Sequence, residues 1–196
     1  MKAANMKTGL SIVLVAALLS NAPIVKANSQ DEQALMAGVQ GFYGWVVKNG
    51  KQVSALQPQI KDIAGSKKFQ LDTKNLKTFS GKFMASGYFA PDFPATLERY
   101  YGKYQQQFKA YTDAEFAQMA KDGRGPLMET EDMDIFFCAQ EYEYKQSFIK
   151  KIKAKTIKLD GDKASVIVVS PYQWEAEFKF VKVDQRWLIT GYCVFQ

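Results

Sequence analysis

Apolar and charged side chains alternate through the C-terminal part of the chain, and this period of two constrains the fold most. The clearest run sets apolar against charged residues: Trp174, Ala176, Phe178 and Phe180 against Glu175, Glu177 and Lys179. Such alternation is typical of a β-strand with one buried and one solvent-facing side. Strands are predicted at 151–159, 166–169, 174–180 and 187–195, with turns at 160–161 and 184–186. We expect an antiparallel meander with Trp174, Trp187 and Ile189 on its buried side.

A helical period appears earlier in the chain. The first helix is predicted from apolar residues at steps of four, three and four: Leu35, Val39, Phe42 and Val46. Asn49 and Gly50 favour its end, because both tolerate the left-handed conformation that terminates helices. Further glycines inside it would let the helix lie close on a sheet: Gly38, Gly41 and Gly44.

A second helix follows in the middle of the chain. Its apolar residues keep helical spacing: Leu97, Tyr101, Tyr104, Phe108 and Tyr111. Thr112 and Glu115 then form a capping box, which predicts a short helix from Asp113 to about Lys121. Residues 51–90 show no readable pattern. Helices first and a meander last predict a single α+β domain.

The N-terminus is typical of a secretory signal peptide. Lys2 and Lys7 precede an apolar run, Leu10–Leu19, and small residues lead to a polar start after Ala27. We therefore expect residues 1–27 to be removed and 28–196 to be a soluble, periplasmic or secreted domain. The apolar run is too short to span a bilayer comfortably, since spanning takes about 20 residues.

The charge of the exported domain excludes one class of partner. Removing the signal peptide takes away Lys2, Lys7 and Lys26, which lowers the formal net charge of +6 by three. So mild an excess of positive charge argues against a nucleic-acid partner.

Missing residue types exclude common catalytic sites. The chain has no histidine, so Ser-His-Asp and Cys-His arrangements and histidine zinc sites are impossible. The only cysteines are Cys138 and Cys193, and in an oxidising compartment an even count favours a disulfide. The alternative is two separate buried thiols; a reactive thiol is disfavoured because no base or cation is arranged to lower its pKa. No cofactor and no metal are expected.

Three segments resemble a known family: "GFYGWVV", "EDMDIFFCAQEY" and "VKVDQRWLITGY". They are similar to exported bacterial domains of unknown function in the cystatin-like, nuclear-transport-factor-2-like superfamily, over roughly residues 32–195. The resemblance implies a roll in which N-terminal helices pack on a curved antiparallel sheet around a conical cavity. In that superfamily the cavity holds a ligand, catalyses a reaction or is filled by side chains.

Acidic residues before Cys138 and tyrosines after it are the candidates for a catalytic site. Enzymes of the superfamily use an aspartate as a base, often with a tyrosine donor, which would assign Asp132 or Asp134 with Tyr142 or Tyr144. The simpler interpretation of these acids is a solvated turn. Calcium binding is disfavoured, since the expected glycine and distal glutamate are missing.

Lysines form one basic patch at the start of the predicted sheet: Lys145, Lys150, Lys151, Lys153, Lys155 and Lys158. Alternation with apolar residues indicates the wet side of a strand. The functional alternative is a surface that steers an acidic partner, centred on Lys151, Lys153 and Lys155.

The expected function is that of an exported, non-enzymatic binding protein. Our specific hypothesis is an immunity or inhibitor protein that neutralises a toxin delivered to the periplasm. The alternatives are a cavity enzyme that uses the aspartate and tyrosine, and a small-ligand carrier lined by the aromatic residues of 100–111.

Export predicts a processed N-terminus. Protein isolated from its native host should begin at Asn28, because the signal peptidase cleaves after the small residue Ala27. Intact-mass spectrometry of the envelope and cytoplasmic fractions measures this. An unprocessed Met1 start in the cytoplasmic fraction would contradict export.

Overall fold

A computed structural model describes residues 29–66 and 68–196; the predicted signal peptide and its cleavage site lie outside these residues. The helices are α1 (Ser29–Ser54), α2 (Leu76–Ala85), α3 (Phe93–Ala110), α4 (Asp113–Lys121) and α5 (Gln146–Ile149). The strands are β1 (Gln59–Asp62), β2 (Phe69–Asp72), β3 (Lys153–Asp160), β4 (Lys163–Val169), β5 (Glu175–Val183) and β6 (Arg186–Tyr192).

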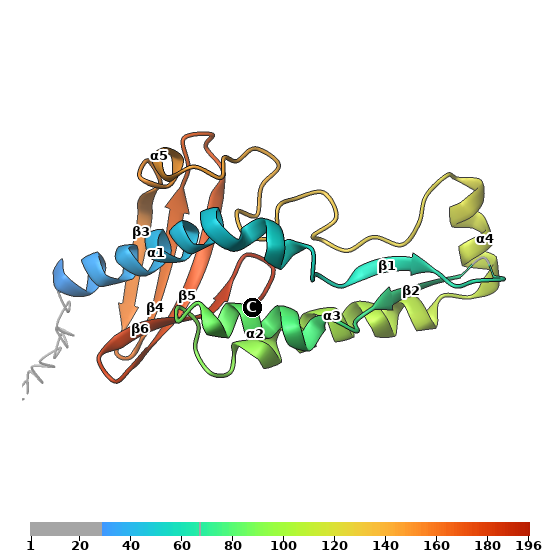
Figure 1. Cartoon of the computed structure of the whole chain (residues 1–196), viewed down its shortest axis with the longest axis horizontal. Helices are drawn as coiled ribbons and strands as arrows, with labels where there is room; N and C mark the ends of the chain where they lie inside the picture. Colours follow the sequence, from blue (N-terminus) through green and yellow to red (C-terminus); the bar gives the residue numbers. More distant parts are fainter. Residues whose placement is uncertain (1–28, 67) are drawn as a thin grey trace, which may run out of the picture.

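The described chain is elongated and has two parts (Figure 1). At one end α1 lies across a four-stranded antiparallel sheet in the order β3-β4-β5-β6. At the other end an arm extends, formed by the β1–β2 hairpin, the C-terminal part of α3, and α4. The α+β class and the C-terminal meander are therefore confirmed.

The sheet follows its predicted turns but ends early. Asp160 pairs with Lys163, so Gly161 occupies the turn with a φ of 58°. Asp184 and Gln185 form the later turn, both with positive φ. The prediction that the last strand reaches residue 195 was wrong. Cys193 has a φ of 56° and turns the chain, so that Phe195 pairs back to Tyr192.

Helix α1 is longer than predicted, because Asn49-Gly50 does not end it. Gly50 is buried inside the helix, where an added Cβ would lie 2.7 Å from the Tyr144 ring. Of the three earlier glycines only Gly38 faces the sheet, where an added Cβ would lie 3.4 Å from the ring of Phe180. A Cβ at Gly41 would instead lie 2.6 Å from the ring of Tyr88, in the segment that follows α2.

The helices of the middle region agree with the sequence. The capping box between Thr112 and Glu115 is present in full, and α4 spans the predicted residues. The aromatic residues of α3 are all buried: Phe93, Tyr100, Tyr101, Tyr104 and Phe108.

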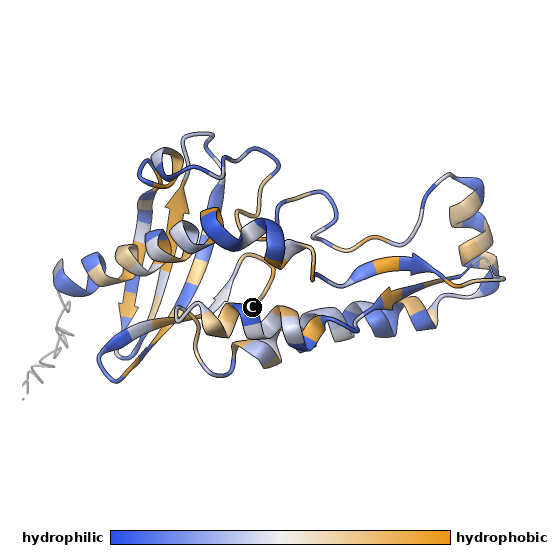
Figure 2. Ribbon diagram, in the orientation of Figure 1, coloured by the Kyte–Doolittle hydropathy of each residue, from blue (hydrophilic) through white to orange (hydrophobic). Residues whose placement is uncertain are grey.

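Aromatic rings fill the space between α1 and the sheet. Phe42 of α1 lies edge-on to Phe178 of β5 and Tyr192 of β6, with ring centroids 6.2 and 5.2 Å apart. The ring centroid of Phe42 also lies 5.1 Å from that of Phe89. Apolar residues are interspersed with polar ones along α1 and the strands, as elements with one buried side require (Figure 2). Side chains therefore fill the space between this part of α1 and the sheet.

A disulfide and a pair of hydrogen bonds to Asp31 stabilise this packing. The predicted disulfide between Cys138 and Cys193 is confirmed; it joins the loop at 122–145 to the end of β6. At the opposite end, Asp31 of α1 accepts hydrogen bonds from Lys182 Nζ at 2.9 Å and Trp187 Nε1 at 2.8 Å. The start of α1 is thereby tied to the β5–β6 hairpin.

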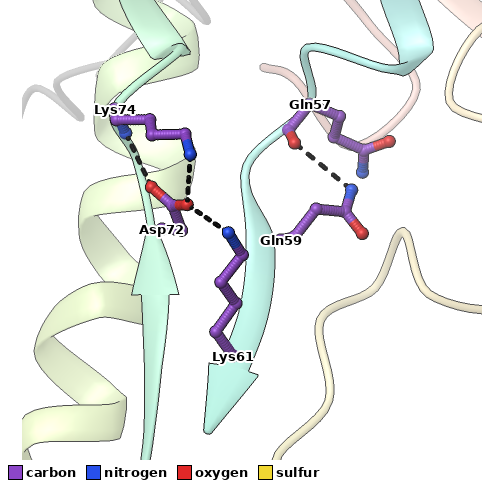
Figure 3. Close-up of polar contacts among 5 residues, drawn as sticks. All are labelled: Gln57, Gln59, Lys61, Asp72 and Lys74. Carbon is purple, nitrogen blue, oxygen red and sulfur yellow. Dashed lines mark hydrogen bonds and ion pairs between the residues drawn. The ribbon is translucent and has the colours of Figure 1, made fainter. Parts of the chain in front are cut away.

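Ion pairs at the base of the arm hold the β1–β2 hairpin (Figure 3). The Asp72 carboxylate accepts a bond from Lys61 Nζ at 2.7 Å, and Lys74 Nζ lies 3.5 Å away. Gln59 donates nearby to the Gln57 carbonyl. Hydrogen bonds lower the pKa of Asp72 to about 2; the bond from Lys61 Nζ has the larger effect and the bond from the Lys74 amide the smaller. Because the ionised Asp72 is favoured in the folded protein, it stabilises the fold at pH values above its ordinary pKa near 4. That stabilisation is lost as the pH falls toward 2.

The strand phase is confirmed for Trp187 and Ile189, which are buried. Trp174 differs from the prediction: it precedes β5, is only partly buried, and donates its Nε1–H to the Glu141 carbonyl at 2.8 Å.

Replacing the buried indole of β6 tests this packing. Trp187→Ala should lower the free energy of unfolding by roughly 3–5 kcal/mol, the range for removal of a large core aromatic. The control Trp187→Phe keeps an aromatic ring in the core but loses the hydrogen bond to Asp31, so it should cost less than the alanine variant, about 1–2 kcal/mol. Urea denaturation followed by circular dichroism measures both. A change within about 0.5 kcal/mol for the alanine variant would place the side chain at the surface.

Candidate functional site

The structure joins two of the four residues of the catalytic hypothesis. Tyr144 donates its hydroxyl to Asp134 Oδ2 at 2.6 Å. Tyr142 stacks on the ring of Phe137 without a described hydrogen bond to the carboxylate. Asp132 is exposed and stands apart from this contact.

Asp134 organises the turn that leads into the disulfide. Its Oδ1 accepts bonds from the amides of Phe136 at 3.0 Å and Phe137 at 2.9 Å. Its backbone carbonyl accepts from the Cys138 amide at 2.8 Å. Burial raises the pKa of Asp134, while the bonds from Tyr144 and the two amides oppose that rise. Both carboxylate oxygens thus hold the fold of the loop.

A hollow of about 370 Å³ lies beside this carboxylate. Its lining includes Glu131, Asp132, Asp134 and Gln140, together with Tyr142. Among the residues that the structure describes, no group of three or more His, Cys, Asp or Glu side chains is arranged to hold a metal ion.

The predicted lysines separate into different environments. Lys151 and Lys153 are exposed at the start of the sheet. Lys155 is exposed too, but its Nζ lies 2.5 Å from Glu175 Oε1 on β5. The β3–β4 register shifts between Ala154 and Thr156, so Lys155 is the extra residue of a bulge. Its charge is already compensated within the sheet.

The register gathers other lysines on the face of the sheet opposite α1. Lys158 of β3 pairs with Ser165 of β4, and Ser165 pairs with Lys179 of β5. Lys163 lies two residues from Ser165 on the same side of β4, because side chains alternate along a strand. We call Lys153, Lys158, Lys163 and Lys179 the basic face.

A surface hollow of about 550 Å³ lies beside three of these lysines. Lys158, Lys163 and Lys179 line it, together with Ser165 and Thr190. Acidic residues stand at its margin: Asp92 and Asp160. The hollow therefore offers ammonium and hydroxyl donors to an anionic group.

The lysines of the basic face are not held in ion pairs. Within residues 29–66 and 68–196, the ion pairs involve other lysines, such as Lys155 and Lys182, and none of the four in the basic face. Acids share the face, since Asp160 lies opposite Lys163 and Glu177 lies two residues from Lys179 on β5. The four lysines nevertheless form no ion pair with them, so their ammonium groups are available to the carboxylates of a partner.

Sequence reasoning missed Lys163 and Lys179 as members of this face. The signal was present only in part: the alternation of β5 places Lys179 on the solvent-facing side of its own strand. The exact pairing of the strands supplies the remaining step.

The chain matches no protein-family model, and comparisons with curated proteins and with solved structures likewise found no match. The resemblance to the cystatin-like superfamily therefore stays a prediction. None of the helices in the described part of the chain combines the length and the apolar character that a membrane crossing requires.

A tyrosine substitution tests the structural role of Asp134. Tyr144→Phe removes a bond to a mostly buried carboxylate, and it should cost about 1–3 kcal/mol of unfolding free energy. The matched control is Tyr142→Phe, which loses a hydroxyl with no described hydrogen bond and should change stability by less than about 0.5 kcal/mol. Equilibrium unfolding in urea compares the two. Equal stability of both variants would mean that the Asp134–Tyr144 bond does not support the fold.

Proposed function

We propose that the protein binds an acidic protein partner through the basic face and catalyses no reaction. The observation that carries the proposal is the row in which Lys158 and Lys179 flank Ser165, neither lysine forming an ion pair among the described residues. Lysines so placed attract carboxylates and raise the rate of association with a negatively charged surface.

Two features of the fold support binding over the alternatives. The aromatic residues of α3 that would line a small-ligand carrier are instead packed in the core: Tyr100, Tyr101, Tyr104 and Phe108. Asp134 is held by three hydrogen bonds within its own loop. The second candidate function is that of a cavity enzyme, and the observation that favours it is the hollow beside Asp134.

The disulfide is consistent with an oxidising compartment. It supports the proposal that the protein is exported and works in the periplasm or outside the cell. The more specific hypothesis, that the partner is a toxin neutralised by an immunity or inhibitor protein, stays a prediction.

Charge reversal tests the proposal. A partner is first captured from the native envelope fraction, and its association with the protein is then measured by biolayer interferometry at low and high salt. Lys158→Glu with Lys179→Glu should slow association about tenfold or more at low salt, and the difference should shrink as salt rises. The matched control is Lys77→Glu with Lys82→Glu on α2, which makes the same change of charge at exposed positions away from the basic face.

Two outcomes would contradict the proposal. One is an equal slowing by the α2 control, which would show an effect of net charge alone. The other is the discovery of a catalytic activity that Asp132→Asn with Asp134→Asn abolishes while the circular dichroism of the protein is unchanged. That result would favour the cavity enzyme, since loss of a positioned acid or base typically costs about 10²–10⁴-fold in rate.

A further inference from the structure

The four-stranded sheet has one covered edge and one open edge. At the β6 edge, Ile189 donates its amide to the Tyr88 carbonyl at 2.8 Å, and Ala90 donates to the Ile189 carbonyl at 2.9 Å. The segment around Phe89 therefore pairs with β6. Among the described residues, β3 pairs only with β4, and Figure 1 shows it at the margin of the sheet. Its outward amides and carbonyls are available to another strand.

The second half of β3 is suited to strand addition. The bulge at Lys155 disturbs the first half, whereas Thr156–Asp160 pairs with β4 in unbroken register. Ile157 and Leu159 are only partly buried and point toward the core side of the sheet. Lys158 points to the basic face between them. An added strand would thus meet apolar side chains on one side and a lysine on the other.

The charge of β3 selects the occupant. A second copy of β3 would bring together two strands that each carry three lysines and one acid: Lys153, Lys155, Lys158 and Asp160. Like charges across a strand pair are destabilising, and edge lysines are a known protection against self-association. An acidic strand converts the same repulsion into attraction.

We propose that an extended segment of the acidic partner adds to β3 as a further strand. The segment alternates acidic and apolar residues: the acidic ones lie next to Lys158 on the basic face, and the apolar ones pack against Ile157 and Leu159. This inference rests on the proposed function and specifies how the partner is held. Main-chain hydrogen bonds supply the affinity and alternate side chains supply the specificity, as in other strand additions.

The test uses synthetic peptides as probes for the mature protein. The first is acetyl-EVEVEVE-amide, built from L residues. The second has the same sequence with alternating L and D residues, which keeps the charge and cannot form a regular strand. Binding is measured by fluorescence anisotropy of labelled peptides, and amide hydrogen exchange is followed by NMR across Thr156–Asp160.

The L peptide should bind at least tenfold more tightly than its L/D counterpart and should protect amides of β3. Lys158→Gln should weaken binding of the L peptide at least threefold, whereas the matched Lys77→Gln on α2 should leave it unchanged. Equal affinity of the two peptides would overturn strand addition while leaving the basic face as an electrostatic site. Failure of the L peptide to bind, or protection of amides outside β3 alone, would also overturn strand addition. The proposed function would then still be tested separately, by the charge-reversal measurement of partner association.

Discussion

The packing of Phe42 against Phe178 and Tyr192 is the constraint on which the rest of the structure depends. It presses α1 onto one side of the sheet and fills the interior with aromatic rings. Because only that side is covered, polar and charged residues must occupy the other side. The basic face is thus a consequence of how the core is built, and its charge is free to serve recognition.

Much of the fold follows from local patterns in the sequence. The period of two between 151 and 192 predicts the meander, and the Thr112–Glu115 capping box predicts α4 within its observed bounds. The helix end at Gly50 was wrong because tertiary packing overrides local preference: the Tyr144 ring lies where a side chain would be. The β1–β2 hairpin was not predicted, since its strands are only four residues long and depend on contact with α3, which spacing along the chain does not show.

The candidate site was only partly predictable. Asp134 and Tyr144 were named together, yet only the folded loop shows that their contact supports the disulfide turn. Lys155 was placed in the basic patch, but its pairing with Glu175 crosses β4 and cannot be read from spacing along one strand. Lys179 joins Lys158 through the register of three strands, which the sequence does not specify.

The disulfide also determines how the molecule bears mechanical load. Cys193 lies close to the C-terminal residue Gln196, and its bond to Cys138 encloses all four strands of the main sheet in one covalent loop. Tension applied at the C-terminus passes directly to Cys138 and bypasses the ladders between β3 and β6. A partner seated on the sheet would therefore remain on an intact surface while force is transmitted around it.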